Sequence, residues 1–551
     1  MDSSVHPGGY RIEVSASGVS ITAADDAGRR HAVTTLEQMR TPGHHPGSLP
    51  ACEIEDWPDF PVRGVMLDIS RDKVPTLETL RELAGRLASW KMNQLQLYTE
   101  HTFAYRGHEQ VWKDASPFTP DELHDLDSYC AELGIELVPN QNALGHFDRW
   151  LKHDRYRPLA ISPEGFYMLG VVHREAMTLD PAKLGSFTLV SDLLTQLAPH
   201  FTSRLFNIGL DEPFELPPQR AGEWVKWLAR LRDLPALADH ELLVWGDMLS
   251  SHPELIEELP PRVTICEWGY EENHPFDATC RRLEQAGTPF YVCPGTSSWL
   301  SITGRLENML GNVAAAAAAG LAHGAGGYLV TDWGDLGHHQ YLPVAEAGLA
   351  AAAAISWCAE SNSQMDLDGL ARLLDSRVFT DPASELGAAM VGLGRVHRMI
   401  TPQLPNLSAL FIHLAFPQWP VGAGITTGLS TDQLAAVEAQ VGESLEHLER
   451  SRPQRPDGDL VVAEIRNAAR LLLLACHDAG ARLQGDGTLP SIGSEVRKKL
   501  SHDLEAIAAE HRRLWLARNR PGGLADSLAW LEHLKSCYES GAVDPNWFGP
   551  H

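Results

Sequence analysis

The sequence has few of the features that mark metal-binding, disulfide-bonded or nucleic-acid-binding proteins. Its 551 residues include only eight cysteines, which are scattered and show neither a Cys-x-x-Cys pair nor Cys/His ligand spacing. Basic residues are scarce, because 45 Lys and Arg stand against 72 Asp and Glu and leave a formal net charge of -27. Nucleic acids and anionic membrane surfaces bind through basic patches and are therefore disfavoured as partners. We expect no metal site and a neutral or cationic ligand.

Long apolar runs and targeting signals are also missing. No uncharged run of about 18 or more apolar residues occurs, and the Ala-rich stretches 313–320 and 348–355 are too short and too weakly apolar to span a bilayer. The first ten residues show no basic region followed by an apolar stretch, which predicts no signal peptide and a cytoplasmic location. No Gly-rich phosphate loop and no tandem repeat is found. We expect neither a membrane segment nor a nucleotide or other cofactor.

The sequence does contain enough apolar residues for more than one core. Hydrophobic residues make up 44% of the chain and include 15 Trp, as in globular proteins. A chain of 551 residues is too long for one compact core, so two or three domains are expected. Residues 1–57 alternate apolar and polar side chains at 10–15 and 18–23 and turn helical around 32–39. They predict a small α+β segment, followed by a Gly/His/Pro linker at 41–50.

Between residues 58 and 358, short apolar runs alternate with segments of helical periodicity. The eight predicted strands are 62–67, 94–98, 135–140, 205–209, 242–245, 263–267, 289–293 and 327–331. Helical spacing recurs between them at 77–89, 120–133, 184–197 and 222–231. Eight such units predict an α/β fold, a (β/α)8 TIM barrel. Residues 359–551 predict an all-helical C-terminal domain, with helices at 367–374, 431–450, 460–481, 494–518 and 523–538.

A barrel of this kind carries its chemistry at the C-terminal ends of its strands. The eight strand ends read Asp68-Ile-Ser-Arg71, Tyr98-Thr-Glu-His101, Asn140-Gln-Asn-Ala-Leu-Gly-His146, Asp211-Glu212, Trp245-Gly-Asp247, Glu267-Trp-Gly-Tyr270, Pro294-Gly-Thr-Ser-Ser-Trp299 and Asp332-Trp-Gly-Asp335. Tryptophans beside carboxylates are typical of a sugar site, with flat walls for ring faces and polar groups for hydroxyls. Asp211 and Glu212 are the most informative pair, because adjacent carboxylates at one strand end point in different directions and can take different roles.

Several of these motifs resemble glycoside hydrolase family 20, the β-N-acetylhexosaminidases. The segment Arg63-Gly-Val-Met-Leu-Asp-Ile-Ser-Arg71 is similar to the family's first-strand signature, and Glu55-Asp-Trp-Pro-Asp-Phe-Pro61 to its lead-in. The resemblance continues in Lys91-Met-Asn93, Gly145-His146, Asp211-Glu212 and Trp333-Gly-Asp335, over roughly residues 10 to 340. The opening α+β segment also resembles the end of the family's small N-terminal domain.

The resemblance implies an exo-acting, retaining hydrolase that releases terminal β-linked GlcNAc or GalNAc from an oligosaccharide or glycoconjugate. Its mechanism would be substrate-assisted, an exception to the two-carboxylate scheme of most glycosidases. The substrate's 2-acetamido oxygen would attack C1 while Glu212 protonates the leaving oxygen and later activates water. Asp211 would orient the acetamido N–H as an oxazolinium ion forms. His146 would hydrogen-bond Glu212, with Glu100, or alternatively His101, behind it.

The resemblance also implies which groups hold the terminal sugar. Arg71 would donate paired hydrogen bonds to O3 and O4, a fork geometry that selects exo cleavage, and Asp335 would bind O4 or O6. Arg71 pairing only with Asp68 or Asp72, and tryptophans serving as barrel packing, stay open as structural alternatives. The substrate-binding candidates are Arg71, Asp335, Asn142, Tyr270, Trp245, Trp268, Trp299 and Trp333.

The sequence also departs from the family pattern, which predicts a divergent member. Asn207 stands where the family usually has His, and Leu210 where it has a second Gly. The family's strand-seven tyrosine, which binds the acetamido carbonyl, has no counterpart here, and Tyr270, Tyr98 and Tyr105 are the possible substitutes.

Two alternative functions remain open. The first is a barrel glycosidase that acts on another β-hexoside and uses a protein nucleophile such as Glu267. The second is a catalytically silent sugar-binding protein on the same barrel. Retention of both Asp211 and Glu212 favours the substrate-assisted enzyme over both. The sequence does not indicate the oligomeric state or the choice between GlcNAc and GalNAc.

Overall fold

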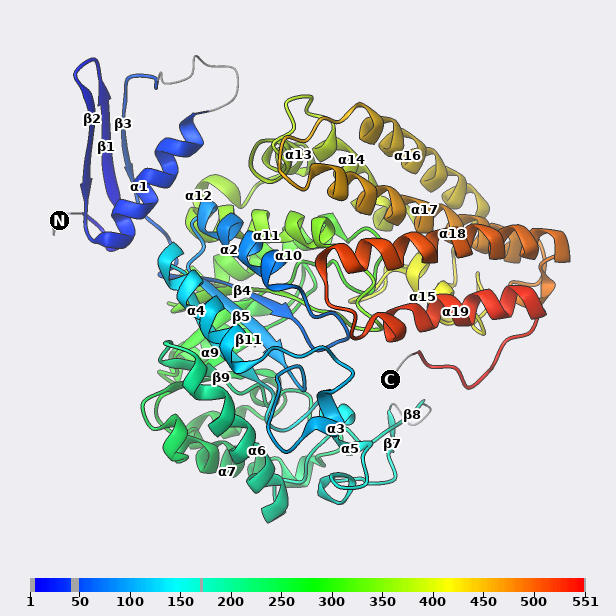
Figure 1. The fold of residues 1–551 in the computed structure, drawn as a ribbon, viewed down its shortest axis with the longest axis horizontal. Coiled ribbons are helices and arrows are strands. Elements are labelled where there is room, and N and C mark those ends of the chain that lie inside the picture. The colour runs from blue at the N-terminus through cyan, green and yellow to red at the C-terminus, as the bar shows by residue number, and fades with distance from the viewer. Residues whose placement is uncertain (1–4, 41–48, 169–171, 550–551) are drawn as a thin grey trace.

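The chain begins with a small sheet covered by one helix (Figure 1). The computed structural model describes residues 5–40, 49–168 and 172–549. Strands β1 (Tyr10–Ser15), β2 (Gly18–Ala23) and β3 (Cys52–Asp56) form an antiparallel sheet in the order β2-β1-β3, packed against α1 (Asp26–Met39). Most of the expected linker, residues 41–48, lies outside the described residues.

Two details of this first segment differ from the sequence-based expectation. Helix α1 starts at Asp26 rather than near residue 32, because the Asp25 side chain accepts the N–H of Gly28 and caps the helix. Strand β3 was not predicted. Its sequence, Cys-Glu-Ile-Glu-Asp, carries only one strongly apolar residue, and its strand conformation depends on the ladder with β1.

The central part is a closed parallel barrel of eight strands, as predicted. In chain order the strands are β4 (Val62–Asp68), β5 (Gln94–Thr99), β6 (Glu136–Gln141), β9 (Leu205–Asn207), β10 (Glu241–Trp245), β11 (Val263–Trp268), β12 (Phe290–Cys293) and β13 (Gly327–Asp332). Pairing of β13 with β4 closes the ring. Strands covered on both faces are buried along their whole length, as β5 is, which is why they read as short apolar runs.

Helices surround the barrel and connect its strands. The longer ones are α2 (Leu77–Ser89), α4 (Pro120–Leu133), α6 (Leu184–Leu197), α7 (Gly222–Arg232), α9 (Phe276–Gln285), α10 (Leu306–Ala322) and α11 (Leu342–Trp357). The short ones are α3 (Glu109–Trp112), α5 (Asp148–Leu151) and α8 (Asp247–Ser251). Only α8 and a 3-10 turn at Pro253–Glu258 join β10 to β11.

Local sequence signals fix where these helices begin and end. In α4, Thr119 and Glu122 form a capping box and Pro120 occupies the first turn. Gly134 ends the helix with φ +77, a left-handed conformation that favours glycine. The predicted bounds 120–133 are therefore met. A small hairpin, β7 (Phe166–Met168) and β8 (Val172–Arg174), interrupts the long connection between β6 and α6 and was not predicted.

The C-terminal part is helical, as predicted. Its helices are α12 (Ala359–Asn362), α13 (Leu367–Leu373), α14 (Leu386–Gly394), α15 (Ala409–Ala415), α16 (Thr431–Arg450), α17 (Gly458–Leu483), α18 (Ser494–Arg518) and α19 (Leu524–Ser540). A π-helical turn at Leu374–Phe379 continues α13. No helix in the described part of the chain is long and apolar enough to cross a bilayer.

The helical part packs against the barrel beside the loop that follows β4. The backbone N–H of Arg520 donates to the carbonyl of Val74 at 2.8 Å. Gly523 adopts φ +77 next to Asp72, and a Cβ there would lie 1.8 Å from the carbonyl oxygen of Asp72. This close approach requires glycine and brings the α18–α19 loop against the first barrel loop. In Figure 1, α19 lies on the side of the barrel that also carries β7 and β8.

Candidate active site

The adjacent carboxyls Asp211 and Glu212 lie at the end of β9, where the backbone leaves the strand abruptly. Leu210 and Glu212 have φ +69 and +46, a left-handed conformation that costs energy for residues with a side chain. The N–H of Glu212 donates to Asp247 Oδ2 at 3.0 Å, which helps to hold this turn. Gly145 allows the β6 loop to approach, because a Cβ there would lie 2.4 Å from the carbonyl oxygen of Asp211. The turn thus places both carboxyls beside the residue that follows Gly145.

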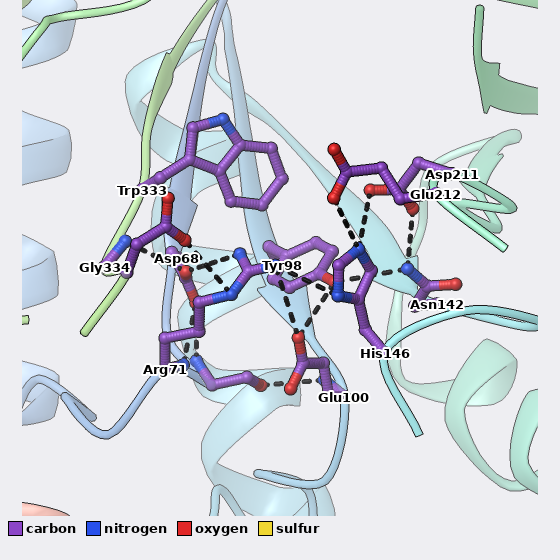
Figure 2. Close-up of polar contacts among 12 residues, drawn as sticks. Asp68, Arg71, Tyr98, Glu100, Asn142, His146, Asp211, Glu212, Trp333 and Gly334 are labelled. Carbon is purple, nitrogen blue, oxygen red and sulfur yellow. Dashed lines mark hydrogen bonds and ion pairs between the residues drawn. The ribbon is translucent and has the colours of Figure 1, made fainter. Parts of the chain in front are cut away.

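That residue, His146, contacts both carboxyls. Its Nε2 lies 3.3 Å from Asp211 Oδ2 and 3.5 Å from Glu212 Oε2, while its Nδ1 lies 3.3 Å from the guanidinium of Arg71. Figure 2 shows the ring between Arg71 and the acidic pair. Asn142 donates from Nδ2 to the other oxygen of Asp211, Oδ1, at 2.7 Å. The structure therefore brings together four of the predicted residues around Asp211.

The electrostatics of this cluster separate the two carboxyls. Burial acts to lower the pKa of His146, but the charge and hydrogen bond of Asp211 outweigh it and raise that pKa to about 9. Burial acts to raise the pKa of Asp211, yet the His146 cation brings it below its ordinary value. Burial raises the pKa of Glu212 despite the same cation. Asp211 is thus an anion paired with His146, and Glu212 is biased toward the protonated acid.

Arg71 is fixed from several sides at the end of β4. Its guanidinium lies 3.1 Å from Asp68, 3.3 Å from Asp335 and 3.8 Å from Glu100. The group also stacks over the ring of Trp333, with its central carbon 4.9 Å from the ring centroid. Asp68 is fully buried and accepts the backbone N–H groups of Ser70, Arg71 and Gly334. Arg71 therefore pairs with Asp68, which was the structural alternative to a role in substrate binding. It also lines the cavity that is described below.

Glu100 contacts Tyr98 and Arg71 at the end of the second barrel strand. Its Oε1 accepts the hydroxyl proton of Tyr98 at 3.0 Å, and the Arg71 guanidinium contacts the same oxygen. Among the described residues no hydrogen bond joins the side chains of Glu100 and His146, and each of them contacts the Arg71 guanidinium. Burial raises the pKa of Glu100 to about 7. The alternative partner, His101, is buried, and its Nδ1 has no hydrogen-bond partner among the described residues.

The aromatic candidates pack mainly against one another. Trp333 Nε1 donates to the hydroxyl of Tyr270 at 2.7 Å, and the Trp333 ring lies 5.8 Å from that of Trp245. Trp268 stacks on Tyr270 at 5.2 Å. Trp299 contacts Tyr270 edge-on and is only 1% exposed, so it lies behind Tyr270 rather than in the cavity. Tyr270 is thus at the centre of the cluster.

The possible substitutes for the strand-seven tyrosine are positioned differently. Tyr105 donates its hydroxyl proton to Gln141 and Tyr98 donates to Glu100, so both protons are used inside the protein. The Tyr270 hydroxyl instead accepts from Trp333 Nε1. Asn207 donates to Gln96 Oε1 at 3.0 Å and is fully buried. Of the three tyrosines, Tyr270 is the one whose hydroxyl serves as an acceptor to a tryptophan of the predicted site.

A cavity of about 400 Å³ opens above these residues, within the size range of small-ligand sites. It contains Arg71, Glu100, His146, Glu212 and Asp335 of the predicted set, whereas Asp211, Asn142, Tyr270 and the tryptophans lie outside its lining. Its wall also includes residues that were not predicted, among them Arg174, Glu175, Met177, Phe214, Leu300 and Leu336. Most of them come from connections between strands and helices, where apolar periodicity gives no signal.

Asp247 is a further group near the acidic pair. Besides the Glu212 amide it lies near Trp268, whose Nε1 is 3.4 Å from its Oδ1. Burial and the neighbouring charge of Asp211 raise the pKa of Asp247 to about 7. Glu267, named as a possible nucleophile, instead faces His274 at 3.3 Å and is absent from the cavity lining.

The sequence matches two family models in consecutive order. Residues 1–57 match "Glycosyl hydrolase family 20, domain 2", and residues 60–309 match "Glycosyl hydrolase family 20, catalytic domain". The chain belongs to glycosyl hydrolase family 20.

Individual relatives in family 20 are distant. A β-hexosaminidase of Akkermansia muciniphila is 26% identical over 228 residues, which cover 38% of this chain and 46% of that protein. A β-N-acetylhexosaminidase of Cellulomonas fimi is 26% identical over 310 residues, covering 53% of this chain and 59% of that protein. The matched part of the chain spans only about a third to six tenths of the length of these relatives.

A solved structure shows the same fold. The family 20 β-N-acetylhexosaminidase of Streptomyces coelicolor A3(2) superimposes with a TM-score of 0.52 at 20% identity, covering 71% of this chain and 82% of that one. At 20% identity this similarity supports the fold assigned to the chain and does not indicate its substrate.

Proposed function

We propose that this protein is an exo-acting, retaining β-N-acetylhexosaminidase that removes terminal β-linked GlcNAc or GalNAc by substrate-assisted catalysis. The observation that carries the proposal is the contact of His146 with two adjacent carboxyls whose pKa values move in opposite directions. One carboxylate and one carboxylic acid, side by side, are what a reaction needs when it stabilises a positive acetamido group and protonates a leaving oxygen.

In the first step the acetamido oxygen of the substrate forms a bond to C1, and the bond from C1 to the leaving oxygen breaks. Glu212 gives its proton to that oxygen, and Asp211 accepts the acetamido N–H as the oxazolinium ion forms. In the second step water attacks C1, its proton returns to Glu212, and the acetamido group reopens. Asp211 remains ionised throughout because His146 pairs with it. His146 thus acts through Asp211 and Glu212.

The sugar would be held by the groups that line the cavity near Arg71. A guanidinium fixed by Asp68 and Asp335 presents its remaining donors in one plane, suited to two neighbouring hydroxyls. Asp335 keeps about a third of its side chain exposed and is available to a further hydroxyl. For the acetamido carbonyl we assign Tyr270, which lies outside this lining, because Trp333 donates to its oxygen and the hydroxyl proton can turn to a ligand.

The test is the hydrolysis of aryl β-GlcNAc and β-GalNAc glycosides by the wild type, Asp211→Asn and Glu212→Gln. Both variants should lose about 10² to 10⁴-fold in kcat/KM. Glu212→Gln should be partly spared on aryl groups that leave without protonation. A thiazoline that mimics the cyclised acetamido group should inhibit the wild type. Equal activity of Asp211→Asn and wild type would overturn substrate assistance.

A further inference from the structure

We propose that Phe214 is the platform for the sugar ring on the leaving-group side of the scissile bond. The natural substrates would then be glycans in which the terminal 2-acetamido sugar is linked to another sugar. The inference rests on the proposed function, because it takes Glu212 as the acid that protonates the oxygen joining the two rings.

The chain places Phe214 directly next to that acid. Phe214 follows Glu212 by two residues, and its backbone N–H donates to the carbonyl of Glu212 at 2.7 Å. Both side chains line the same cavity, which also contains Arg71 and Asp335. Because Glu212 must reach the leaving oxygen, the group attached to that oxygen has to pass beside Glu212. Phe214 borders that path.

The exposure of Phe214 is unusual for its place. The ring is 47% exposed, and among the large apolar side chains described as exposed it is the one that lines this cavity. A single exposed apolar residue on a protein surface needs no explanation. An exposed aromatic ring at the mouth of a catalytic cavity is different, because it offers a flat apolar surface where a ligand has to pass. Tyr167, which is 67% exposed but lies outside the cavity, is the contrasting case.

The backbone on both sides of Phe214 is held in place. Leu216 donates its N–H to the carbonyl of Pro213 at 2.8 Å, which closes the turn around Phe214. Glu215 accepts the backbone N–H of Met177 at 3.3 Å and ties the turn to the segment that follows β8. A platform that is already ordered loses little conformational entropy when it binds a ring.

The surroundings of Phe214 select a sugar rather than a lipid. Sugars combine apolar C–H faces with hydroxyl edges, so a sugar site needs a flat apolar surface together with hydrogen-bonding groups. The same cavity wall carries the apolar Met177 and the charged Arg174 and Glu175. An alkyl or ceramide leaving group would favour a wall without charges, because buried charges lose solvation against hydrocarbon.

The experiment compares two substrates that differ only in the leaving group, on the far side of the scissile glycosidic bond. N,N′-diacetylchitobiose has a second sugar ring there, and methyl β-N-acetylglucosaminide has none. We expect Phe214→Ala to lower the ratio of kcat/KM for the disaccharide to kcat/KM for the methyl glycoside by about fivefold or more, mainly through KM of the disaccharide. Phe214→Trp should restore the ratio. Tyr167→Ala, an exposed aromatic outside the cavity, should keep the wild-type ratio.

Each other outcome decides against the platform. An unchanged ratio in Phe214→Ala, with or without a loss common to both substrates, would mean that the ring only supports the Glu212 turn. Failure of Phe214→Trp to restore the ratio would exclude stacking as the cause. If the wild type hydrolyses neither these substrates nor the aryl β-GlcNAc and β-GalNAc glycosides, the proposed function itself fails, which is distinct from a wild type that cleaves both substrates while Phe214→Ala leaves the ratio unchanged.

Discussion

His146 Nε2 lies 3.3 Å from Asp211 Oδ2, and this ion pair decides how the neighbouring carboxyls titrate. The pair keeps Asp211 ionised below its ordinary pKa, while burial pushes the pKa of Glu212 upward. Two carboxyl groups that are adjacent in the chain therefore have pKa values shifted in opposite directions. The difference comes from the histidine, which the β6 loop places beside them.

His146→Gln should move the whole pH profile of kcat/KM toward higher pH and lower its maximum by about 10²-fold. The acid limb reports protonation of Asp211, and the alkaline limb reports loss of the proton from Glu212. The His146 cation lowers the pKa of both groups, so removing it raises both and shifts both limbs upward. The measurement is kcat/KM on an aryl β-GlcNAc glycoside across pH 3 to 9, a range chosen to include both limbs.

His101→Gln is the matched control, because His101 is the other histidine considered for the relay. Burial lowers the pKa of His101 well below the ordinary value, so the ring is neutral. It therefore has no charge that could shift the pKa values behind the two limbs of the pH profile. Both limbs should stay at their wild-type positions. An acid limb that stays in place in His146→Gln would contradict the role of the ion pair.

Asp247→Asn should make the fold more stable at pH 8 than the wild type, with a smaller difference at pH 5. The folded-state pKa of Asp247 is raised to about 7, above the ordinary value of about 3.9. For a carboxyl with a raised pKa, the stabilising contribution is full below the unfolded-state pKa and is lost as pH rises through the folded-state pKa. Asn keeps an uncharged group at the same place and avoids that loss.

The measurement for Asp247→Asn is the thermal unfolding midpoint at pH 5 and pH 8. Asn retains an oxygen that can accept the N–H of Glu212, so kcat on an aryl glycoside should fall by less than about tenfold. Asp247→Ala removes that acceptor, so its kcat should fall further than that of Asp247→Asn. A wild type with the same midpoint as Asp247→Asn at pH 8 would show that Asp247 titrates normally.

Arg71→Lys should raise KM and lower kcat/KM by about 10²-fold while the protein stays folded. The lysine keeps a positive charge among Asp68, Glu100 and Asp335 but loses the planar fork that binds two hydroxyls. Two charge-assisted hydrogen bonds of about 1.5 kcal/mol each account for the loss.

Arg71→Met separates binding from folding. It leaves three carboxyl groups without their common cation and should lower the unfolding midpoint as well as the activity. Steady-state kinetics and thermal unfolding of both variants form the measurement. A lysine variant with wild-type KM would contradict direct contact between Arg71 and the substrate.

Sequence patterns predicted the barrel because buried parallel strands are short apolar runs and the segments between them have helical periodicity, which the helix caps in the structure reinforce. Strand β5 and helix α4 show both signals, as an entirely buried run and as a capping box. Strand β3 gave neither, since its conformation depends on pairing with β1 across the intervening helix.

The candidate site was predicted at the level of strand ends and not of contacts. The barrel rule placed His146, Asp211 and Glu212 at strand ends, the resemblance to family 20 implied that His146 contacts Glu212, and the structure has His146 close to both carboxyls. Glu100 was expected behind His146, and the structure has both side chains in contact with Arg71, an arrangement that depends on how side chains from three strands share one space. Phe214 was not predicted, since a loop residue has no periodicity that marks it.

Asp526→Asn should raise KM about two- to fivefold with little change in kcat. Asp526, at the start of α19, lies 2.9 Å from the guanidinium of Arg149, whose other nitrogen pairs with Asp72. Asp72 follows Arg71 directly and has φ +73. The two ion pairs of Arg149, with Asp526 and with Asp72, therefore help to hold the loop that carries Arg71. The Asp526 side chain is 40% exposed, and such a pair contributes about 0.2 to 1 kcal/mol, which converts to the change expected.

Glu539→Gln is the control for this last prediction, because Glu539 lies on the same helix and forms an exposed ion pair with Lys535 that is remote from the cavity. Glu539→Gln should leave both KM and kcat unchanged. Asp526→Glu should recover most of the wild-type KM, since it restores the charge. A fall in kcat that Asp526→Glu does not reverse would mean that α19 supports the fold as a whole. A selective, reversible change in KM would instead assign to the helical domain a part in positioning Arg71.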